Sequence, residues 1–190
     1  SLGHGVFFGF GAYAIGMHLM LTIGTESVYG SALPDFMVWN QVKELPLFWK
    51  PFYSFGVALA GAVLVPTLFA FIFGFLAFRS RIKGVYFAII TQALALCAWL
   101  VFNRNETNLG GTNGLTDFKQ ILGFRLSEPG TQRALYILTV LFLGAAYVVC
   151  RWIIRSRAGR VLVAIRDSEQ RVLFSGYSPA NYKLFVFVVS

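Results

Sequence analysis

Residues 52–78 read FYSFGVALAGAVLVPTLFAFIFGFLAF, a run of 27 residues without a single Asp, Glu, Lys or Arg. As an α-helix this stretch would be about 40 Å long, whereas the hydrocarbon core of a bilayer is about 30 Å thick. We therefore expect a membrane-spanning helix that is tilted or kinked, and Pro66 near its middle offers a site for the kink.

Apolar stretches of this kind recur along the whole chain. With the one above, they predict membrane spans at about 1–24, 52–78, 84–102, 134–154 and 179–190, the last of them cut off. The expected fold class is all-α, a polytopic helical transmembrane bundle that forms a single domain over residues 1–190. Because apolar sequence lies at both ends, we expect an internal part of a longer protein.

The composition excludes the common soluble classes. Of the 190 residues, 57% are hydrophobic and 13% are charged, whereas soluble domains average about 45–50% and about 25%. A soluble enzyme, a disulfide scaffold and a disordered tail all fit poorly. The two cysteines, Cys97 and Cys150, lie in or at the end of apolar runs without metal-ligand spacing, and we expect them to be small buried apolar residues.

The net charge of +8 is concentrated in alternate loops. Residues 79–83 hold three bases and no acid, and residues 151–183 hold seven bases and two acids, while 25–51 and 103–133 are nearly neutral. Basic loops stay on the cytoplasmic side of a membrane, so the first two segments are expected inside and the last two outside. A nucleic-acid partner is not expected, since its binding face would mix bases with exposed aromatics on one domain.

The first predicted span is rich in glycine and holds both histidines of the chain. Its Gly5-xxx-Gly9 pattern permits either close helix packing or a broken helix along a substrate path. His4 and His18 fall on one helical face about 21 Å apart. That spacing suits two haem groups, but no further His is available as an opposing ligand. Hydrogen-bonded histidines near the membrane surface are the other interpretation.

Polar residues within the 84–102 span form a second candidate feature. Gln92, beside Thr91, lies near its centre, where an amide needs a partner and tends to face the bundle interior or a wet cavity. Because an amide both donates and accepts hydrogen bonds, we take His4, Thr91 and Gln92 as candidate substrate-pathway residues for a small neutral polar solute. The alternative is that Gln92 only holds helices together.

The outer loop after residue 103 contains a glycine-rich turn. Its candidate residues are Gly110, Gly111, Asn113 and Gly114. This composition favours tight turns with positive φ. The turn is either an ordinary exposed loop or a docking surface for an external partner.

The basic inner loop 155–178 is expected to hold a weakly amphipathic helix at residues 160–174 that ends at Gly176. Its apolar side would be formed by Val161, Ile165 and Val172. Such a helix lies either on anionic lipid or against a protein. The two acids Asp167 and Glu169 favour a protein partner.

Motifs for catalysis are missing from the sequence. We find no paired carboxylates within the predicted spans, no phosphate-cradling loop and no metal-ligand spacing. We therefore expect neither an enzyme nor a cofactor held by this chain.

Several motifs together resemble one family. They are SLGHGVFFG at 1–9 with GAY at 11–13, RSRIKGVY at 79–86, TQA at 91–93, GGTNGL at 110–115 and GRVLVAIRD at 159–167. This set resembles the LivM-like permeases, which are membrane subunits of bacterial ABC importers for branched-chain amino acids and related solutes. Four further segments are similar to the urea-importer branch of that family: LPDFM at 33–37, ELP at 44–46, NGLTDFK at 113–119 and ILGF at 121–124.

The resemblance implies a multi-pass subunit of the bacterial inner membrane. ATP would be bound by two cytoplasmic ATPase subunits, and a second, homologous permease and an external solute-binding protein would complete the importer. The 155–178 loop would be the coupling loop that docks on the ATPase. Its contact residues would be Ala164, Arg166, Asp167, Glu169 and Gly176.

Three functions remain open at this point. Urea import leads, because the first four predicted spans lack charged side chains up to Arg151 and urea needs only neutral hydrogen-bonding groups. A branched-chain amino acid permease is the alternative, since helix termini can bind a zwitterion. A membrane electron carrier with haem on His4 and His18 belongs to a different class.

The charge pattern makes a testable statement about orientation. In a variant without Cys97 and Cys150, a cysteine at Arg81 should react with a membrane-impermeant thiol reagent only from the cytoplasmic side, and one at Asn113 only from outside, because the basic loops remain inside. Labelling of intact cells and of inverted vesicles measures this. The reverse pattern of labelling contradicts the orientation.

Overall fold

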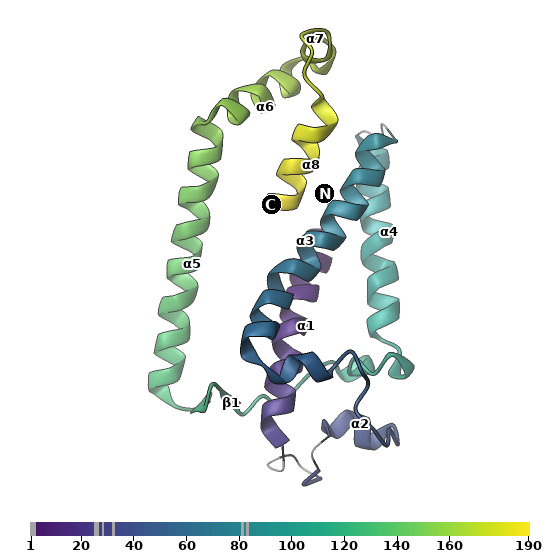
Figure 1. The fold of residues 1–190 in the computed structure, drawn as a ribbon, viewed down its shortest axis with the longest axis vertical. Coiled ribbons are helices and arrows are strands. Elements are labelled where there is room, and N and C mark those ends of the chain that lie inside the picture. Colours follow the sequence, from purple (N-terminus) through teal and green to yellow (C-terminus); the bar gives the residue numbers. More distant parts are fainter. Residues whose placement is uncertain (1–2, 25–26, 28, 32, 81, 83) are drawn as a thin grey trace. The chain divides into compact units, whose positions relative to one another are not determined.

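The computed structural model describes residues 3–24, 27, 29–31, 33–80, 82 and 84–190 (Figure 1). Some residues used in the sequence predictions lie outside this described part, among them Glu26 of the nearly neutral 25–51 segment. Ser1 and Leu2 open the first predicted span and the first family motif, and Arg81 and Lys83 belong to the inner basic turn.

Helices dominate the described part of the chain, which confirms the all-α prediction. The long ones are α1 (His4–Ile23), α3 (Phe55–Arg79), α4 (Val85–Phe102) and α5 (Pro129–Arg155). By length and composition, these four are apolar enough to cross a membrane, and α8 (Pro179–Val189) is a shorter apolar helix. Helix α5 begins before the apolar stretch at 134, because proline favours the first position of a helix and the following Gln and Arg are good helix formers.

Short elements fill the segments between the long helices. They are α2 (Asp35–Trp39), η2 (Lys50–Tyr53), η3 (Asn105–Thr107), η4 (Gly111–Asn113), α6 (Arg157–Asp167) and α7 (Glu169–Phe174). One antiparallel hairpin pairs β1 (Gln120–Ile121) with β2 (Phe124–Arg125). Its turn residues Leu122 and Gly123 both have positive φ, as a tight hairpin turn requires.

The chain divides into two compact units, and α3 contributes to both. The first unit comprises residues 1–69 and 84–128, and the second comprises residues 70–83 and 129–190.

Helix α1 is the centre of the first unit and lies antiparallel to the first half of α3. A Cβ added at Gly11 would stand 2.9 Å from the carbonyl oxygen of Ala62, so the two backbones touch without an intervening side chain. The ring of Phe10 packs edge-on against Phe69, with 4.9 Å between centroids. Helix α4 runs parallel to α1, and Tyr13 packs against Phe102 at 4.4 Å.

The predicted Gly5-xxx-Gly9 contact is not the one that the structure uses. A Cβ added at Gly5 or Gly9 would meet no atom of the described residues within 4 Å. The close approaches of α1 occur instead at Gly3, Gly11 and Gly16. The spacing of glycines alone could not tell which of them faces a neighbouring helix.

The two loops that are predicted to lie outside, here called the outer loops, fold into a packed cap at the carboxyl end of α1. Met37 and Trp49 are completely buried there, and they pack with Met17, Met20, Leu21 and Ile23 of α1. The indole nitrogen of Trp49 donates a hydrogen bond to the carbonyl of Asn108, 3.2 Å away, and so ties one outer loop to the other.

This cap corrects an expectation for one tryptophan. The positions of Trp39, Trp49, Trp99 and Trp152 near the predicted span ends favour an interfacial aromatic belt. Trp39, Trp99 and Trp152 are exposed, as a belt requires, whereas Trp49 is buried. Its buried neighbours include residues of α1, far from it along the chain, so no local pattern around Trp49 indicates that core.

The second unit contains α5, the inner helices α6 and α7, and α8. Ser156 caps α6 by accepting a hydrogen bond from the amide of Gly159, 3.2 Å away. A Cβ at Gly159 would collide with the carbonyl oxygens of Ile153 and Ile154, so glycine is required at the corner between α5 and α6. Helix α8 packs on the second half of α3, where Gly74 faces Leu184 and Phe187.

The expectation of one inner helix over residues 160–174 is wrong, because the helix breaks at Ser168. That residue is extended, with φ −160° and ψ 96°. Its amide closes α6 through the carbonyl of Ala164, and its carbonyl accepts from the amide of Val172 at the start of α7. Both halves then bury an apolar side chain, Ile165 in α6 and Val172 in α7.

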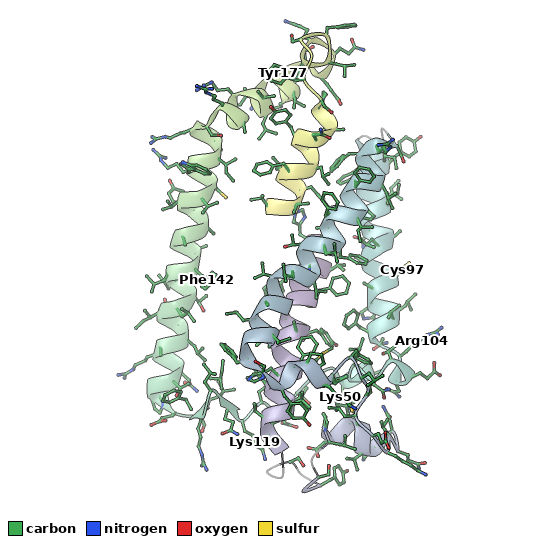
Figure 2. All side chains as sticks on the ribbon, viewed as in Figure 1. Lys50, Cys97, Arg104, Lys119, Phe142 and Tyr177 are labelled. Atoms are coloured by element: carbon green, nitrogen blue, oxygen red, sulfur yellow. The ribbon has the colours of Figure 1, made fainter. Side chains whose placement is uncertain are left out.

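The cysteines also differ from the expectation. Cys97 and Cys150 are free thiols that are exposed in the described structure. Figure 2 shows Cys97 on α4 and Phe142 on α5, whose side chains point outward from their helices. Both helices carry apolar side chains on such outward faces, so an outward-facing cysteine there remains in apolar company.

The contact at Gly11 leads to a prediction about stability. Gly11→Leu should destabilise the protein by about 1–3 kcal/mol, because the added side chain forces α1 away from the Ala62 backbone. The matched control is Gly9→Leu, on the same helix but with open space around the position. Thermal unfolding in detergent measures both, and equal midpoints for the two variants would show that the Gly11 contact is not tight.

Candidate functional site

The predicted pathway residues lie where the start of α1 meets α4. Thr91 is completely buried, and its hydroxyl donates to the carbonyl of Ala88, 2.9 Å away. A Cβ at Gly3 would stand 3.1 Å from the Thr91 carbonyl oxygen, so the backbone just before His4 presses directly on Thr91. The structure therefore brings the first residues of α1 to the middle of α4.

The side chains of the three predicted residues do not converge on one point. Thr91 faces the interior, whereas Gln92 is on the exposed face of α4. His4 is exposed as well and packs its ring edge-on against Phe7, with 6.3 Å between centroids. Gln92 makes no hydrogen bond with any residue that the structure describes. Its amide is thus available to a molecule that lies against this face of α4.

The second histidine joins two helices. His18 is 4% exposed, and its Nδ1 lies 2.8 Å from the carbonyl oxygen of Phe52. Its ring packs against Phe55, with 5.4 Å between centroids. This setting does not fit a haem, because the imidazole is enclosed between α1 and the start of α3. The hydrogen-bonding interpretation of His18 agrees with these contacts.

The glycine-rich outer turn is built on backbone geometry that only glycine adopts easily. Gly110, Gly111 and Gly114 all have positive φ. A Cβ at Gly111 would collide with the side-chain oxygen of Asn105, and one at Gly110 with the backbone of Gly114. Three of the four predicted loop residues therefore have a structural role, and Asn113 is the exposed one.

An outer cavity of about 510 Å³ lies beside Asn113, and the sequence did not reveal it. Its lining combines apolar residues of α1 and α2 with charged residues of both signs. The charged ones are Asp35, Asp117 and Lys119. The sequence shows two polar loops, but no pattern in either loop indicates that the two lie side by side and enclose a cavity. Such a lining suits polar contacts with a protein loop or a small solute.

The inner helices expose most of the predicted coupling residues. Ala164, Arg166, Asp167 and Gly176 are all exposed, and Arg166 pairs with its neighbour Asp167 at 3.1 Å. Gly176 has φ +84° and ends α7, as expected for a C-terminal glycine.

Glu169 differs from the other predicted coupling residues. Its carboxylate lies 2.8 Å from the Lys183 ammonium group, and both side chains are less than one third exposed. The pair links the first turn of α7 to the first half of α8. Sequence reasoning missed this link, because the two residues are in different helices with a turn between them.

A basic groove lies between α6 and α7. This cavity of about 580 Å³ is lined by Arg157, Arg160 and Arg171, with Asp167 as the acid among its lining residues. The described residues contain no cluster of three or more His, Cys, Asp or Glu side chains that could hold a metal ion. The inner face is therefore suited to an acidic or anionic surface.

Comparison with known proteins assigns these features to a family. The family described as the permease component of the branched-chain amino acid transport system matches residues 1–190. The high-affinity branched-chain amino acid transport system permease protein LivM of Salmonella typhimurium is 23% identical, and LivM of Escherichia coli is 24% identical. Each comparison covers 93% of this chain and 44% of the relative, so the chain spans less than half the length of either. No solved structure matches.

The ion pair between α7 and α8 leads to a prediction. Glu169→Lys and Lys183→Glu should each destabilise the α7–α8 junction by about 1 kcal/mol, and the double exchange should restore it, because the pair is re-formed with its charges reversed. Hydrogen exchange of the α7 amides measures this. Asp167→Lys is the control, since its own pair is exposed. Exchange in the double variant as fast as in the single ones would contradict the link.

Proposed function

Because the chain belongs to the family of permease components of branched-chain amino acid transport systems, we propose that it forms part of the membrane path for urea in an ATP-driven importer of the bacterial inner membrane. The permease part of the proposal is supported by the family match over all 190 residues, together with four helices of membrane-spanning length among the described residues. The choice of urea rests on the neutral chemistry of the spans. The chain supplies the path and no covalent chemistry.

We propose that the importer contains a second, homologous permease, two ATPase subunits that bind ATP, and an external solute-binding protein. The exposed residues of α6 and of the turn after α7 are suited to an ATPase surface, since they combine small residues with charges of both signs. They are Ala164, Arg166, Asp167 and Gly176. Glu169 contributes through its link to Lys183 rather than as a free charge. The outer cap, with the exposed Asn113, would face the binding protein.

The solute path is proposed to run along the exposed face of α4. Hydroxyl groups within the long helices are satisfied locally, as for Thr91 with Ala88 and Thr67 with Val63. The amide of Gln92 has no such partner among the described residues, and an unpaired amide in a membrane is costly unless it faces water or a solute. Thr91 would set the distance between α1 and α4, and His4 would lie at the inner end of the path.

The chemistry of the spans supports a neutral solute. Among the described residues, α1 and α4 contain no charged side chain, and α3 has one at its last position, Arg79. The charged residues of α5 are Arg133 near its start and Arg151 and Arg155 near its end, so its apolar middle is also free of charge. A zwitterionic amino acid carries two full charges and needs opposed charges or helix ends. A branched-chain amino acid is the second candidate solute, because both relatives are named for that transport.

Uptake of radiolabelled urea and leucine by cells that carry the complete importer tests the proposal. We expect ATP-dependent accumulation of urea in preference to leucine. Gln92→Leu should lower uptake about tenfold at an unchanged amount of protein in the membrane, because it removes one hydrogen-bonding partner of the solute.

The matched control is Gln132→Leu, which makes the same change at an exposed residue in the first turns of α5. Accumulation of leucine without urea would replace the proposed solute by the second candidate. Normal uptake by Gln92→Leu would remove Gln92 from the path and return it to helix packing.

A further inference from the structure

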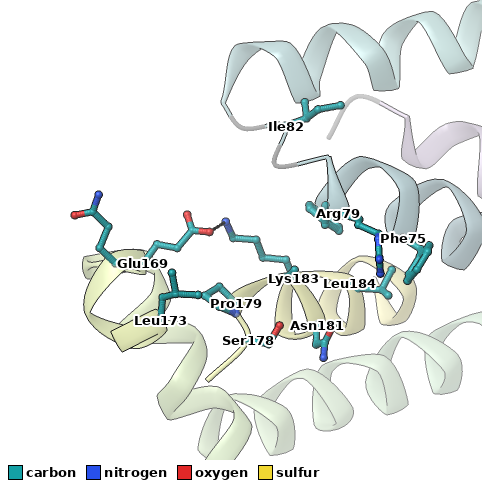
Figure 3. Close-up of a pocket in the computed structure, with 13 residues that line it drawn as sticks. Phe75, Arg79, Ile82, Glu169, Leu173, Ser178, Pro179, Asn181, Lys183 and Leu184 are labelled. Carbon is teal, nitrogen blue, oxygen red and sulfur yellow. Dashed lines mark ion pairs between the residues drawn. The ribbon is translucent and has the colours of Figure 1, made fainter. Parts of the chain in front are cut away.

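A cavity of about 500 Å³ lies where the end of α3 meets α7 and the start of α8 (Figure 3). One part of its wall is apolar and comes from Phe75, Phe78 and Leu184. The other part is polar and carries Arg79 from α3 and Lys183 from α8. The volume is within the range of small-molecule sites, about 300–1,000 Å³.

The charges in this cavity leave one cation uncompensated. Lys183 is paired with Glu169, and the dashed line in Figure 3 marks that contact. Arg79 has no acidic partner within ion-pair distance among the described residues, and its guanidinium lies over the Phe75 ring, 5.6 Å from the centroid. The ring holds the guanidinium at the border between the apolar and the polar wall. An anion that enters this cavity would therefore meet a positioned arginine.

The surrounding surface is that of a membrane interface. The last two turns of α3 expose the apolar side chains of Ile72 and Leu76, and Arg79 ends the helix on the side that the basic loops assign to the cytoplasm. Tyr177 and Tyr182 flank the first residues of α8, and their ring centroids are 6.2 Å apart. Tyrosine and arginine are residues typical of the headgroup region.

We propose that this cavity binds the phosphate headgroup of an anionic phospholipid from the inner leaflet. Arg79 donates hydrogen bonds to the phosphate, for which the guanidinium fork is well suited. The acyl chains extend along Phe75 and Leu184 into the bilayer. Basic pockets between helices on the cytoplasmic side favour such lipids over zwitterionic ones. The proposal goes beyond solute transport and does not depend on which solute is carried.

The test uses the complete importer, purified in detergent and freed of lipid. Native mass spectrometry measures the binding of phosphatidylglycerol and of phosphatidylcholine at equal acyl-chain length. We expect phosphatidylglycerol to bind more tightly, and Arg79→Gln to weaken its binding about fivefold, as expected for one interfacial arginine. Arg155→Gln is the matched control, because Arg155 ends α5 and does not line the cavity; its affinity for phosphatidylglycerol should be unchanged.

Three outcomes would overturn the proposal. They are equal affinity for the two lipids, an unchanged affinity in Arg79→Gln, and displacement of the lipid by millimolar inorganic phosphate, which would indicate a site for free anions. If the Arg79→Gln importer fails to assemble, a photoreactive phosphatidylglycerol is cross-linked to the unmodified importer, and the labelled peptides locate the lipid. Cross-links on the peptides that contain Phe75 or Leu184 support the site, and cross-links confined to other helices contradict it.

Discussion

The hydrocarbon interior of a bilayer offers no water, so each backbone amide and carbonyl that enters it must find its partner within the protein. The four long helices meet this constraint through their own hydrogen bonds. Threonine hydroxyls follow the same rule, since Thr67, Thr91 and Thr139 all donate to carbonyls of their own helix. An amide side chain has more groups to satisfy than a hydroxyl. Gln92 is therefore the polar residue of α4 that local bonding does not explain, and the proposed path depends on it.

Helix α1 is the packing centre of the first unit, because its small residues allow neighbouring segments to approach its backbone from several sides. Gly11 meets the backbone of α3, and Gly16 admits Leu115 from the outer loop. Next to them His18 bonds to the Phe52 carbonyl. The same helix thus orders both the membrane contacts and the buried core of the cap. A change on α1 is expected to disturb the outer surface as well as the helix packing.

The sequence predicted the helical class and the approximate long helices because charge-free stretches are a strong, local signal. It could not predict contacts that join distant segments. The burial of Trp49 depends on Met37, which belongs to another element of the same loop, and on Asn108, which belongs to the other loop. The break at Ser168 was missed for a different reason, since both halves keep helical propensity and one residue changes direction. Glu169 was expected to be an exposed contact residue, whereas the structure pairs it with Lys183 of another helix, which the sequence pattern does not indicate.

The contacts of α7 and α8 connect the inner loop to the membrane helix α3. The break at Ser168 changes the direction of the chain between α6 and α7, and both of these helices pack on α8. Glu169 and Lys183 join α7 to α8, and Leu184 and Phe187 of α8 fill the space over Gly74 of α3. A displacement of α7 by the proposed ATPase would therefore be transmitted through α8 to the kink-prone helix α3. Glycine at 74 makes room for this contact, because an added Cβ would stand 2.8 Å from the Leu184 side chain and 2.9 Å from the Phe187 ring, so that both would have to shift.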